Sequence, residues 1–296
     1  MSGNKVTIMD GGMGRLLEKM GAPFRQPEWS ALPLIEAPQF VEQAHQAFID
    51  AGAQIIITNT YAVVPFHIGQ EKFDTDGRRL IKLAADIARQ TVKKSGKDVK
   101  IAGSLPPAFG SYRPDLFDTE KAAAIYLPLI EEQEPYIDFW LAETVSSTVE
   151  AKTIASFLKD SKKPLWISFT LKDREDSGDI PQLRSGESID TALQTALDLK
   201  AEAILFNCSQ PEEIEPALQI LSEKAAPISY GAYANAFPAM KKDALANSTI
   251  TELRADACPD NYLTFARKWQ AAGAGIIGGC CGIGPDHIKM LKKLNS

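Results

Sequence analysis

The feature of this sequence that most restricts its possible folds is a regular alternation of short apolar segments with helical patterns along its 296 residues. Eight segments are predicted to be strands: residues 6–10, 55–61, 99–103, 136–143, 164–169, 203–208, 227–233 and 274–279. Eight helical patterns alternate with them: residues 41–51, 80–91, 119–132, 147–159, 188–200, 211–224, 260–272 and 285–294. Such alternation, with nearly continuous apolar strands, is typical of a parallel sheet covered by helices. Eight units predict an α/β fold of the (β/α)8 (TIM) barrel type.

The composition excludes several classes of protein. A formal net charge of −6, with no cluster of basic residues, argues against a nucleic-acid partner. No segment approaches the roughly 18 apolar residues of a membrane span, and the N-terminus lacks the apolar region of a signal peptide. We therefore expect a cytoplasmic protein without a membrane segment. Because no linker or low-complexity run interrupts the pattern, we predict that residues 1–296 form a single domain.

Three cysteines stand where predicted strands end. Cys280 and Cys281 are adjacent and flanked by glycines in the stretch 276–284, and Cys208 ends the sixth strand. A disulfide between neighbouring residues is strained, and four cysteines in all are too few for a disulfide scaffold. Three thiolates suit a tetrahedral Zn²⁺ with one open position. We predict these three cysteines as zinc ligands; the alternative is a buried pair with an unrelated core thiol. The fourth, Cys258, is predicted to lie in a loop.

Polar residues end other predicted strands as well. Asp10 ends the first, Asn59 and Thr60 the second, and Glu143 the fourth. In a (β/α)8 barrel the carboxyl ends of the strands meet at one face, where active sites lie. We therefore expect these residues to share one site with the cysteines. The loops at residues 172–187 and 237–259 are long enough to cover it as lids.

Taken together, these stretches resemble the homocysteine S-methyltransferase family of zinc-dependent thiol methyltransferases. The resemblance covers nearly the whole chain. It rests on Asp10-Gly11-Gly12-Met13-Gly14, Trp29-Ser30-Ala31, Thr58-Asn59-Thr60-Tyr61, Ala142-Glu143-Thr144, Leu183-Arg184-Ser185-Gly186-Glu187-Ser188, Asn207-Cys208 and Gly278-Gly279-Cys280-Cys281-Gly282. The chain departs from the usual family pattern at Arg15, at residues 104–110 and at residues 232–235, all near strand ends, and these departures bear on the methyl donor.

The resemblance implies a role for five of the matching residues. The three cysteines would bind zinc, and Asp10 and Glu143 would bind the amino group of homocysteine as a pair of carboxylates. From the turn after the first strand, we also expect the amides of Gly11 and Gly12 to hold the carboxylate of the substrate, as oriented backbone N–H groups do. Alternatively, each acid is a rim residue paired with a nearby Lys or Arg.

Aromatic residues near the strand ends are candidates for holding a cationic donor. Trp29 is predicted to form a wall for the donor, because a cation over an indole face is attracted; simple loop packing is the alternative. Tyr61 has the same two interpretations. The three histidines do not cluster in the sequence pattern, and His45 and His287 are predicted to face solvent from helices.

The resemblance implies a cytoplasmic enzyme of methionine biosynthesis that moves a methyl group from a small donor to the thiol of homocysteine, with Zn²⁺ as cofactor. S-methylmethionine or S-adenosylmethionine is the favoured donor, betaine is an alternative donor, and methylfolate through cobalamin is the least expected. Selenocysteine is an alternative acceptor. A barrel that stores metal or senses redox state through its thiols is a second class of function, although it would not need the two acids. A lyase or aldolase would need a lysine at a strand end, and Lys172 lies beyond one in a charged loop.

Overall fold

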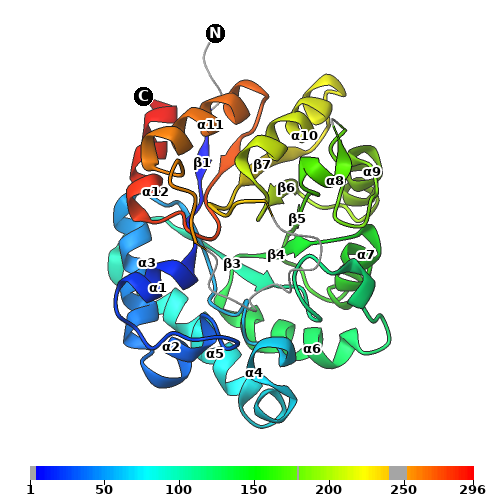
Figure 1. Cartoon of the computed structure of the whole chain (residues 1–296). Coiled ribbons are helices and arrows are strands. Elements are labelled where there is room, and N and C mark those ends of the chain that lie inside the picture. The colour runs from blue at the N-terminus through cyan, green and yellow to red at the C-terminus, as the bar shows by residue number, and fades with distance from the viewer. Residues whose placement is uncertain (1–4, 179, 240–251) are drawn as a thin grey trace.

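Eight parallel strands form the central sheet of the computed structural model, which describes residues 5–178, 180–239 and 252–296 (Figure 1). The strands are β1 (Thr7–Ile8), β2 (Ile55–Ile57), β3 (Lys100–Leu105), β4 (Phe139–Val145), β5 (Leu165–Phe169), β6 (Ala203–Asn207), β7 (Ser229–Tyr233) and β8 (Ile276–Ile277). Their order is β1-β8-β7-β6-β5-β4-β3-β2. A parallel bridge between Met9 and Ile55 joins the two end strands. The predicted (β/α)8 barrel is therefore confirmed.

Helices surround this ring in Figure 1. The longer ones cross between strands: α3 (Gln39–Ala51), α5 (Gln70–Ser95), α6 (Ala122–Gln133), α7 (Thr148–Phe157), α9 (Ile189–Asp198), α10 (Pro211–Glu223), α11 (Pro259–Ala271) and α12 (Pro285–Leu291). These match the eight predicted helical patterns. Short additional elements lie in the loops: α1 (Met13–Lys19), α2 (Ala31–Glu36), α4 (Pro65–Ile68), α8 (Arg174–Ser177), η1 (Pro114–Leu116), η2 (Glu134–Tyr136) and η3 (Lys292–Asn295). Elements this short carry too few residues for a periodic pattern, so the sequence did not predict them.

The helix α3 shows how the sequence specifies these elements. Val41, Ala44 and Phe48 recur on one face and are fully buried, so this face packs against the rest of the barrel. The helix ends at Gly52, whose φ of +110° lies in the left-handed region that glycine adopts without steric cost. Local sequence and tertiary packing thus agree on where this helix starts and stops.

Two apolar layers hold the strands in place. The larger one joins the outer side of the strands to the helices. The smaller one takes side chains from β2 to β8 and from the residue that follows β1, and it fills the inside of the ring, with these members: Met9, Ile55, Ile57, Ala102, Phe139, Leu141, Trp166, Ala203, Leu205, Tyr233, Ile276 and Cys280. A barrel interior of this size is packed with side chains and forms no channel, so the site must lie at its mouth.

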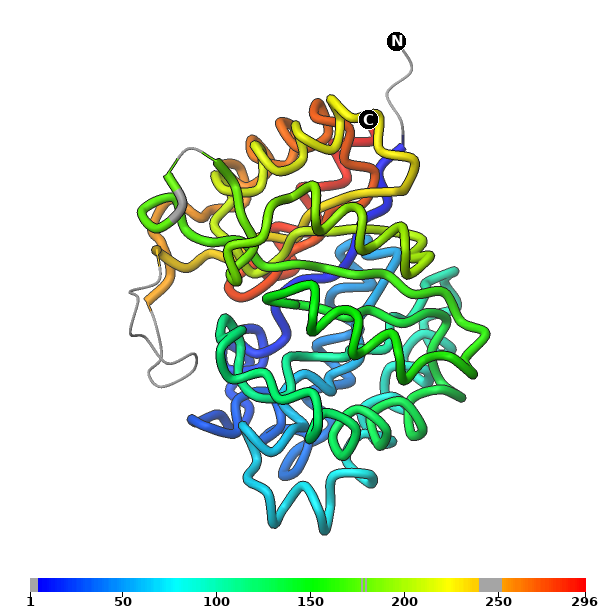
Figure 2. Tube along the Cα trace, turned by 90° about the vertical axis from the view of Figure 1, so that its right-hand side faces the viewer, coloured from blue at the N-terminus to red at the C-terminus, as the bar shows by residue number. Residues whose placement is uncertain are grey.

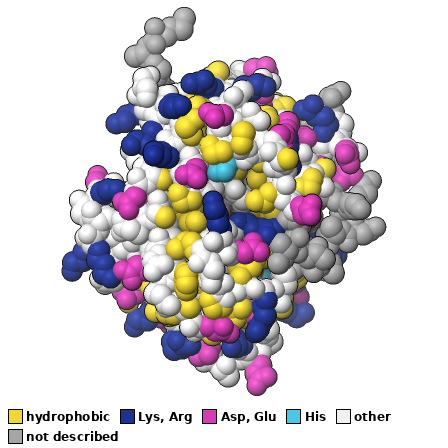
Figure 3. Space-filling model, turned by 60° about the vertical axis from the view of Figure 1, so that its left-hand side comes forward, with side chains coloured by type: hydrophobic (Ala, Val, Ile, Leu, Met, Phe, Trp, Pro, Cys, Tyr) yellow, Lys and Arg dark blue, Asp and Glu magenta, His cyan; other side chains and the backbone are white. Residues whose placement is uncertain are grey.

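The two ends of the described chain lie side by side (Figure 2). The side-chain Oδ1 of Asn295 accepts a hydrogen bond from the Val6 amide at 2.7 Å, and its Nδ2 donates to the Val6 carbonyl at 2.8 Å. On the face shown in Figure 3, basic and acidic side chains are interspersed. None of the described helices combines the length and apolar character needed to cross a membrane.

The expectation that His45 faces solvent is wrong. This residue lies on the buried face of α3 and is 0% exposed, and neither ring nitrogen has a hydrogen-bond partner in the described structure. His287 is partly buried as well, and its Nε2 lies 2.8 Å from the Ala257 carbonyl oxygen. Position 45 lies four residues after Val41 and three before Phe48, so the period of α3 places it on the buried face. The expectation was wrong because it took histidine to be a surface residue. Burial lowers the pKa of His45 to about 4.

This burial predicts an acid-sensitive contribution to stability. Because the pKa of His45 is lower in the folded chain than the ordinary 6.5, its contribution is fully present above pH 6.5 and is lost as the pH falls toward 4. The loss amounts to about 3 kcal/mol if the neutral imidazole stays fully buried. We expect His45→Leu to lose less of its free energy of unfolding between pH 7 and 4.5 than the unmodified protein, measured by urea denaturation. Parallel stability curves for the two proteins would contradict this.

A candidate metal centre at the mouth of the barrel

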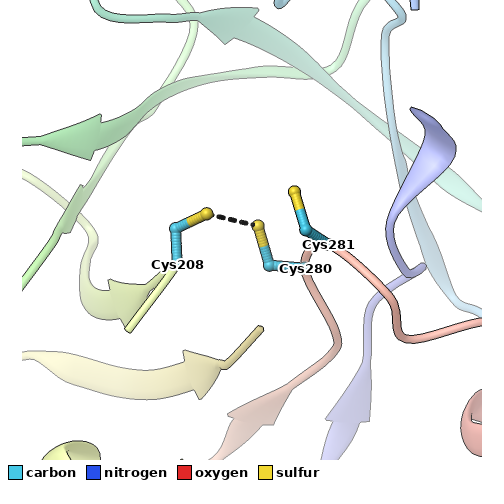
Figure 4. Close-up of side chains that lie close together, drawn as sticks. All are labelled: Cys208, Cys280 and Cys281. Atoms are coloured by element: carbon cyan, nitrogen blue, oxygen red, sulfur yellow. Dashed lines mark hydrogen bonds between the residues drawn. The ribbon is translucent and has the colours of Figure 1, made fainter. Parts of the chain in front are cut away.

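Three cysteine side chains point toward one another at the carboxyl ends of β6 and β8 (Figure 4). Cys208 follows β6 directly, and Cys280 and Cys281 lie in the loop between β8 and α12. Their three sulfur atoms all lie within 4.8 Å of one another, and the Sγ atoms of Cys208 and Cys280 are 3.0 Å apart. The structure thus brings together residues that are 72 positions apart in sequence.

Backbone contacts set the position of this cysteine loop. The Cys280 amide donates to the Ala234 carbonyl at 2.8 Å, and the Ala236 amide donates to the Cys281 carbonyl at 2.8 Å, so the end of β7 holds the loop from one side. Gly12 packs closely against it from the other side. A Cβ added at this position would lie only 2.4 Å from the Cys280 carbonyl oxygen. Only glycine permits this approach.

The side chain of Asn207 organises the neighbouring strand ends. Its Oδ1 accepts hydrogen bonds from the Thr144 amide at 2.9 Å and the Ser168 hydroxyl at 2.7 Å, and its Nδ2 donates to the Thr144 hydroxyl at 2.8 Å. Thr144 and Cys208 both have positive φ, +57° and +51°. Non-glycine residues keep this conformation only where their surroundings fix it. Asn207 therefore helps to turn both chain segments into the site.

The ionisation of the cysteines favours a bound cation. Hydrogen bonds from Cys280, Cys281 and Tyr112 lower the pKa of Cys208 well below its ordinary value. The Cys208 thiolate in turn raises the pKa of Cys280 and of Cys281, and burial adds to this. Three thiolates so close together need a compensating positive charge. A tetrahedral Zn²⁺ with Zn–S bonds of about 2.3 Å separates its sulfur ligands by about 3.8 Å. This value lies between the 3.0 Å of the Cys208–Cys280 pair and the 4.8 Å that bounds the group, so the three cysteines could hold such an ion after small side-chain shifts.

Asp10 lies at the seam where the barrel closes. One carboxylate oxygen, Oδ2, accepts the Ile57 amide at 2.9 Å and so extends the pairing of β1 with β2. The other, Oδ1, is buried without a hydrogen-bond partner in the described structure. Burial raises the pKa of Asp10 well above its usual range, and the nearby Glu143 carboxylate raises it further. One oxygen of this acid is therefore available for a ligand.

Glu143 lies on β4 and lines the same cavity as Asp10. Its Oε1 accepts a hydrogen bond from the Ser104 hydroxyl. Burial raises the pKa of Glu143 to about 7, although the Ser104 hydrogen bond opposes the shift. In the described part of the chain, neither Glu143 nor Asp10 forms an ion pair with Lys or Arg, so the alternative of rim acids with basic partners has no support. Two unpaired acids instead suit a cationic group of a ligand.

One cavity joins these groups and has a volume of about 1000 Å³ up to its open mouth. It is lined by these residues: Asp10, Gly11, Gly12, Met13, Gly14, Trp29, Ser30, Ile57, Thr58, Asn59, Tyr61, Ser111, Tyr112, Glu143, Cys208, Tyr233, Phe237, Gly279, Cys280 and Cys281. All the predicted site residues are among them except Thr60, whose hydroxyl donates to the Ser104 carbonyl at 3.2 Å instead.

Two of the predicted roles change in the structure. The Gly12 amide donates to the Ile283 carbonyl at 2.9 Å, so it is not free to hold a substrate carboxylate. The tight turn at this glycine serves the cysteine loop instead. Trp29 lines the cavity but also packs inside the protein, since Phe24 lies 5.0 Å from its ring and the Arg15 guanidinium lies 5.7 Å from its centre. One face of the indole therefore already has a cation beside it.

Several residues of the site were not singled out from the sequence. Ser104 positions Glu143, and Tyr112 donates a hydrogen bond to Cys208 Sγ at 2.9 Å. Phe237 and Tyr233 add aromatic surface to the cavity. Ser104 and Tyr233 lie at strand ends, a signal that could have identified them. Tyr112 lies in the irregular loop after β3, where the sequence carries no such signal.

Fold and site together define a class of protein: a (β/α)8 barrel whose strand ends carry three cysteines able to hold a metal ion. Comparison with known proteins narrows this class. The sequence model of the family described as homocysteine S-methyltransferase matches residues 7–294. The chain therefore belongs to the homocysteine S-methyltransferase family, and the predicted class of enzyme, a methyltransferase acting on a thiol, is confirmed.

Individual relatives agree with this assignment. Selenocysteine methyltransferase of Astragalus bisulcatus is 26% identical over an alignment of 327 positions, gaps included. The alignment covers 99% of this chain and 93% of the relative. Homocysteine S-methyltransferase YbgG of Bacillus subtilis (strain 168) is 28% identical, with 95% of this chain and 92% of the relative covered. The metallated form of the homocysteine methyltransferase MmuM from Escherichia coli has a TM-score of 0.79 and 27% identity, covering 98% of this chain and 96% of that one.

Proposed function

We propose that this protein transfers a methyl group from a cationic donor to the thiol of homocysteine and so produces methionine. Residues 1–296 would act as one homocysteine-binding barrel domain, with Zn²⁺ held by Cys208, Cys280 and Cys281. The observation that carries this proposal is a single cavity lined by three gathered sulfur atoms and by two buried acids without basic partners. The first group suits a thiol substrate and the second suits its ammonium group.

The acids would orient homocysteine. An ammonium group between Asp10 Oδ1 and the Glu143 carboxylate would form charge-assisted hydrogen bonds, which are stronger than neutral ones. It would also favour ionisation of both carboxyl groups, whose pKa values burial has raised. The Gly11 amide remains the candidate for the substrate carboxylate, because the Gly12 amide is engaged with Ile283. These contacts would leave the thiol directed toward the cysteines.

The reaction is an exchange of one bond for another. When bound, Zn²⁺ would lower the pKa of the homocysteine thiol from its ordinary value of about 8.5 and supply a thiolate at neutral pH. The substrate sulfur forms a bond to the methyl carbon as the bond from that carbon to the donor's positive atom breaks. The bonding electron pair stays with the donor atom, which becomes neutral. The protein itself would hold the two reactants in line within the cavity.

Aromatic side chains favour a cationic donor. Tyr61, Tyr112, Tyr233, Phe237 and Trp29 all line the cavity, and aromatic faces attract sulfonium and quaternary ammonium groups. We infer S-methylmethionine or S-adenosylmethionine as the donor, ahead of betaine. The part of Trp29 that lines the cavity would contribute to this wall.

A second acceptor, selenocysteine, is favoured by one observation. Two of the curated relatives are selenocysteine methyltransferases, at 26% and 28% identity. Selenocysteine has the same ammonium and carboxylate groups as homocysteine, on a side chain one methylene shorter. A barrel that only stores metal or senses redox state would have no use for two unpaired acids in the cavity, so we place this function behind methyl transfer.

The proposal is tested by incubating zinc-loaded protein with homocysteine and each donor in turn, and then measuring methionine together with the demethylated donor. With S-adenosylmethionine we expect methionine and S-adenosylhomocysteine in equal amounts. With S-methylmethionine, whose demethylated form is itself methionine, we expect two methionines for each homocysteine consumed. A parallel reaction with selenocysteine measures the competing acceptor. Loss of methyl groups from the donor without methionine, or no reaction with any donor, would contradict the proposal.

A further inference from the structure

The loop at residues 183–188 is one of the stretches that resemble the family, yet the proposed reaction gives its residues no role. Its backbone is fixed to the barrel mouth. The Arg184 amide donates to the Thr170 carbonyl at 3.1 Å, and the Ser185 amide donates to the Ser146 carbonyl at 3.0 Å. An antiparallel bridge also joins Leu183 to Leu171. The side chain of Arg184 is therefore presented from a well-anchored segment.

The Arg184 guanidinium contacts two groups. It lies 3.2 and 3.4 Å from the carboxylate oxygens of Asp173, and the two side chains are only 10% and 3% exposed. Its Cζ also lies 4.9 Å from the centre of the Tyr112 ring. A guanidinium over an aromatic face is attracted to it, and more strongly where water is excluded. Asp173 thus orients Arg184, and Arg184 packs on Tyr112.

Tyr112 in turn contacts the metal centre. Its hydroxyl donates a hydrogen bond to Cys208 Sγ at 2.9 Å. Its φ of +65° is uncommon for a residue with a side chain and persists only where neighbours fix the conformation. Tyr112 comes from the loop after β3, Arg184 from the loop after β5, and Cys208 from the end of β6. Three separate loops therefore meet at this one hydrogen bond.

We propose that Asp173, Arg184 and Tyr112 act as a chain of positioning residues that fixes the Cys208 thiolate as a metal ligand. A hydrogen bond to a charged sulfur holds its orientation and reduces the charge that it donates to the metal. Outer partners of metal ligands commonly change metal affinity by about 10- to 100-fold when they are removed. This inference rests on the metal-binding part of the proposed function and is independent of donor and acceptor.

The first test removes only the hydroxyl. We expect Tyr112→Phe to bind Zn²⁺ about 10- to 100-fold more weakly, measured by competition with a chromophoric chelator. In the Co²⁺-loaded protein, loss of the hydrogen bond raises the energy of the sulfur lone pairs. The sulfur-to-cobalt charge-transfer band should therefore move to longer wavelength. A merely structural role for Tyr112 would not shift this band.

The second test asks whether Arg184 acts through Tyr112. Lys keeps the positive charge beside Asp173 but cannot stack as a guanidinium does, so Arg184→Lys should weaken metal binding severalfold. In the Tyr112→Phe background the same substitution should have no further effect on metal affinity, because the hydrogen bond is already absent. Additive effects of the two substitutions would overturn the link between Arg184 and Tyr112.

The control is Tyr126→Phe, which removes another buried hydroxyl, one that donates to the Pro106 carbonyl at 2.9 Å and not to a sulfur. Its metal affinity and cobalt spectrum should match those of the unmodified protein. The proposal is overturned if Tyr112→Phe also leaves both unchanged, or if Tyr126→Phe weakens binding equally. Failure of the proposed function would look different, since the protein would bind metal as expected but transfer no methyl group.

Discussion

Replacing Cys281 by Ser is expected to abolish zinc binding and methyl transfer together. A serine hydroxyl has nearly the shape of the thiol but is a poor ligand for Zn²⁺ in a thiolate site. The two remaining cysteines supply too few ligands to hold the ion. We expect the rate of methionine formation to fall by at least about 10³-fold, because a metal contributes several kcal/mol to such a reaction. Zinc per chain is measured by mass spectrometry on the same samples as the activity.

Cys258→Ser provides the matched control. Cys258 is an exposed cysteine at the start of α11, outside the three-cysteine group. Its replacement should change neither the zinc content nor the rate. Full activity of Cys281→Ser without bound metal would contradict the assigned role of the cysteines.

Replacing Glu143 by Gln is expected to weaken homocysteine binding while the zinc content stays the same. Gln has the same shape and can still accept the hydrogen bond from Ser104, but it lacks the charge that would attract an ammonium group. Hydrogen bonds to charged groups contribute about 1.5–3 kcal/mol, so KM for homocysteine should rise about 10- to 100-fold. Affinity for homocysteine is measured by calorimetry and KM by the methionine assay.

Glu150→Gln is the control for this substitution. Glu150 is equally buried, and burial raises its pKa to about 7 as well, but it accepts the Ser146 amide at 2.8 Å and does not line the cavity. Its replacement should leave KM unchanged. Equal KM values for Glu143→Gln and the unmodified protein would remove Glu143 from the proposed binding site.

The sequence predicts most of the fold because the strands of this barrel are buried on both sides. In β6, for example, all five residues are buried and the first four are apolar, so the segment stands out between amphipathic helices. The short helices α2 and α4 were not predicted, since four to six residues show no clear period. His45 was misplaced for a different reason: its spacing from Val41 and Phe48 puts it on the buried face of α3, but its residue type suggested solvent.

The candidate site follows from the same regularity. Parallel strands must end at one face, so Cys208 and Cys280 could be expected to meet although 72 positions separate them. Contacts that depend on loop conformation could not be predicted in this way. The Gly12 amide bonds to Ile283, and Tyr112 reaches Cys208 from a left-handed backbone conformation. Neither follows from residue type or spacing.

The central claim is that three cysteines hold one metal ion that keeps a position for an incoming thiol. X-ray absorption at the zinc edge, on protein with and without homocysteine, measures the sulfur atoms bound to the metal. We predict three sulfur ligands in the zinc-loaded protein and four after homocysteine is added. A sulfur count that does not rise with homocysteine, or a zinc-loaded protein with fewer than three sulfur ligands, would contradict this account.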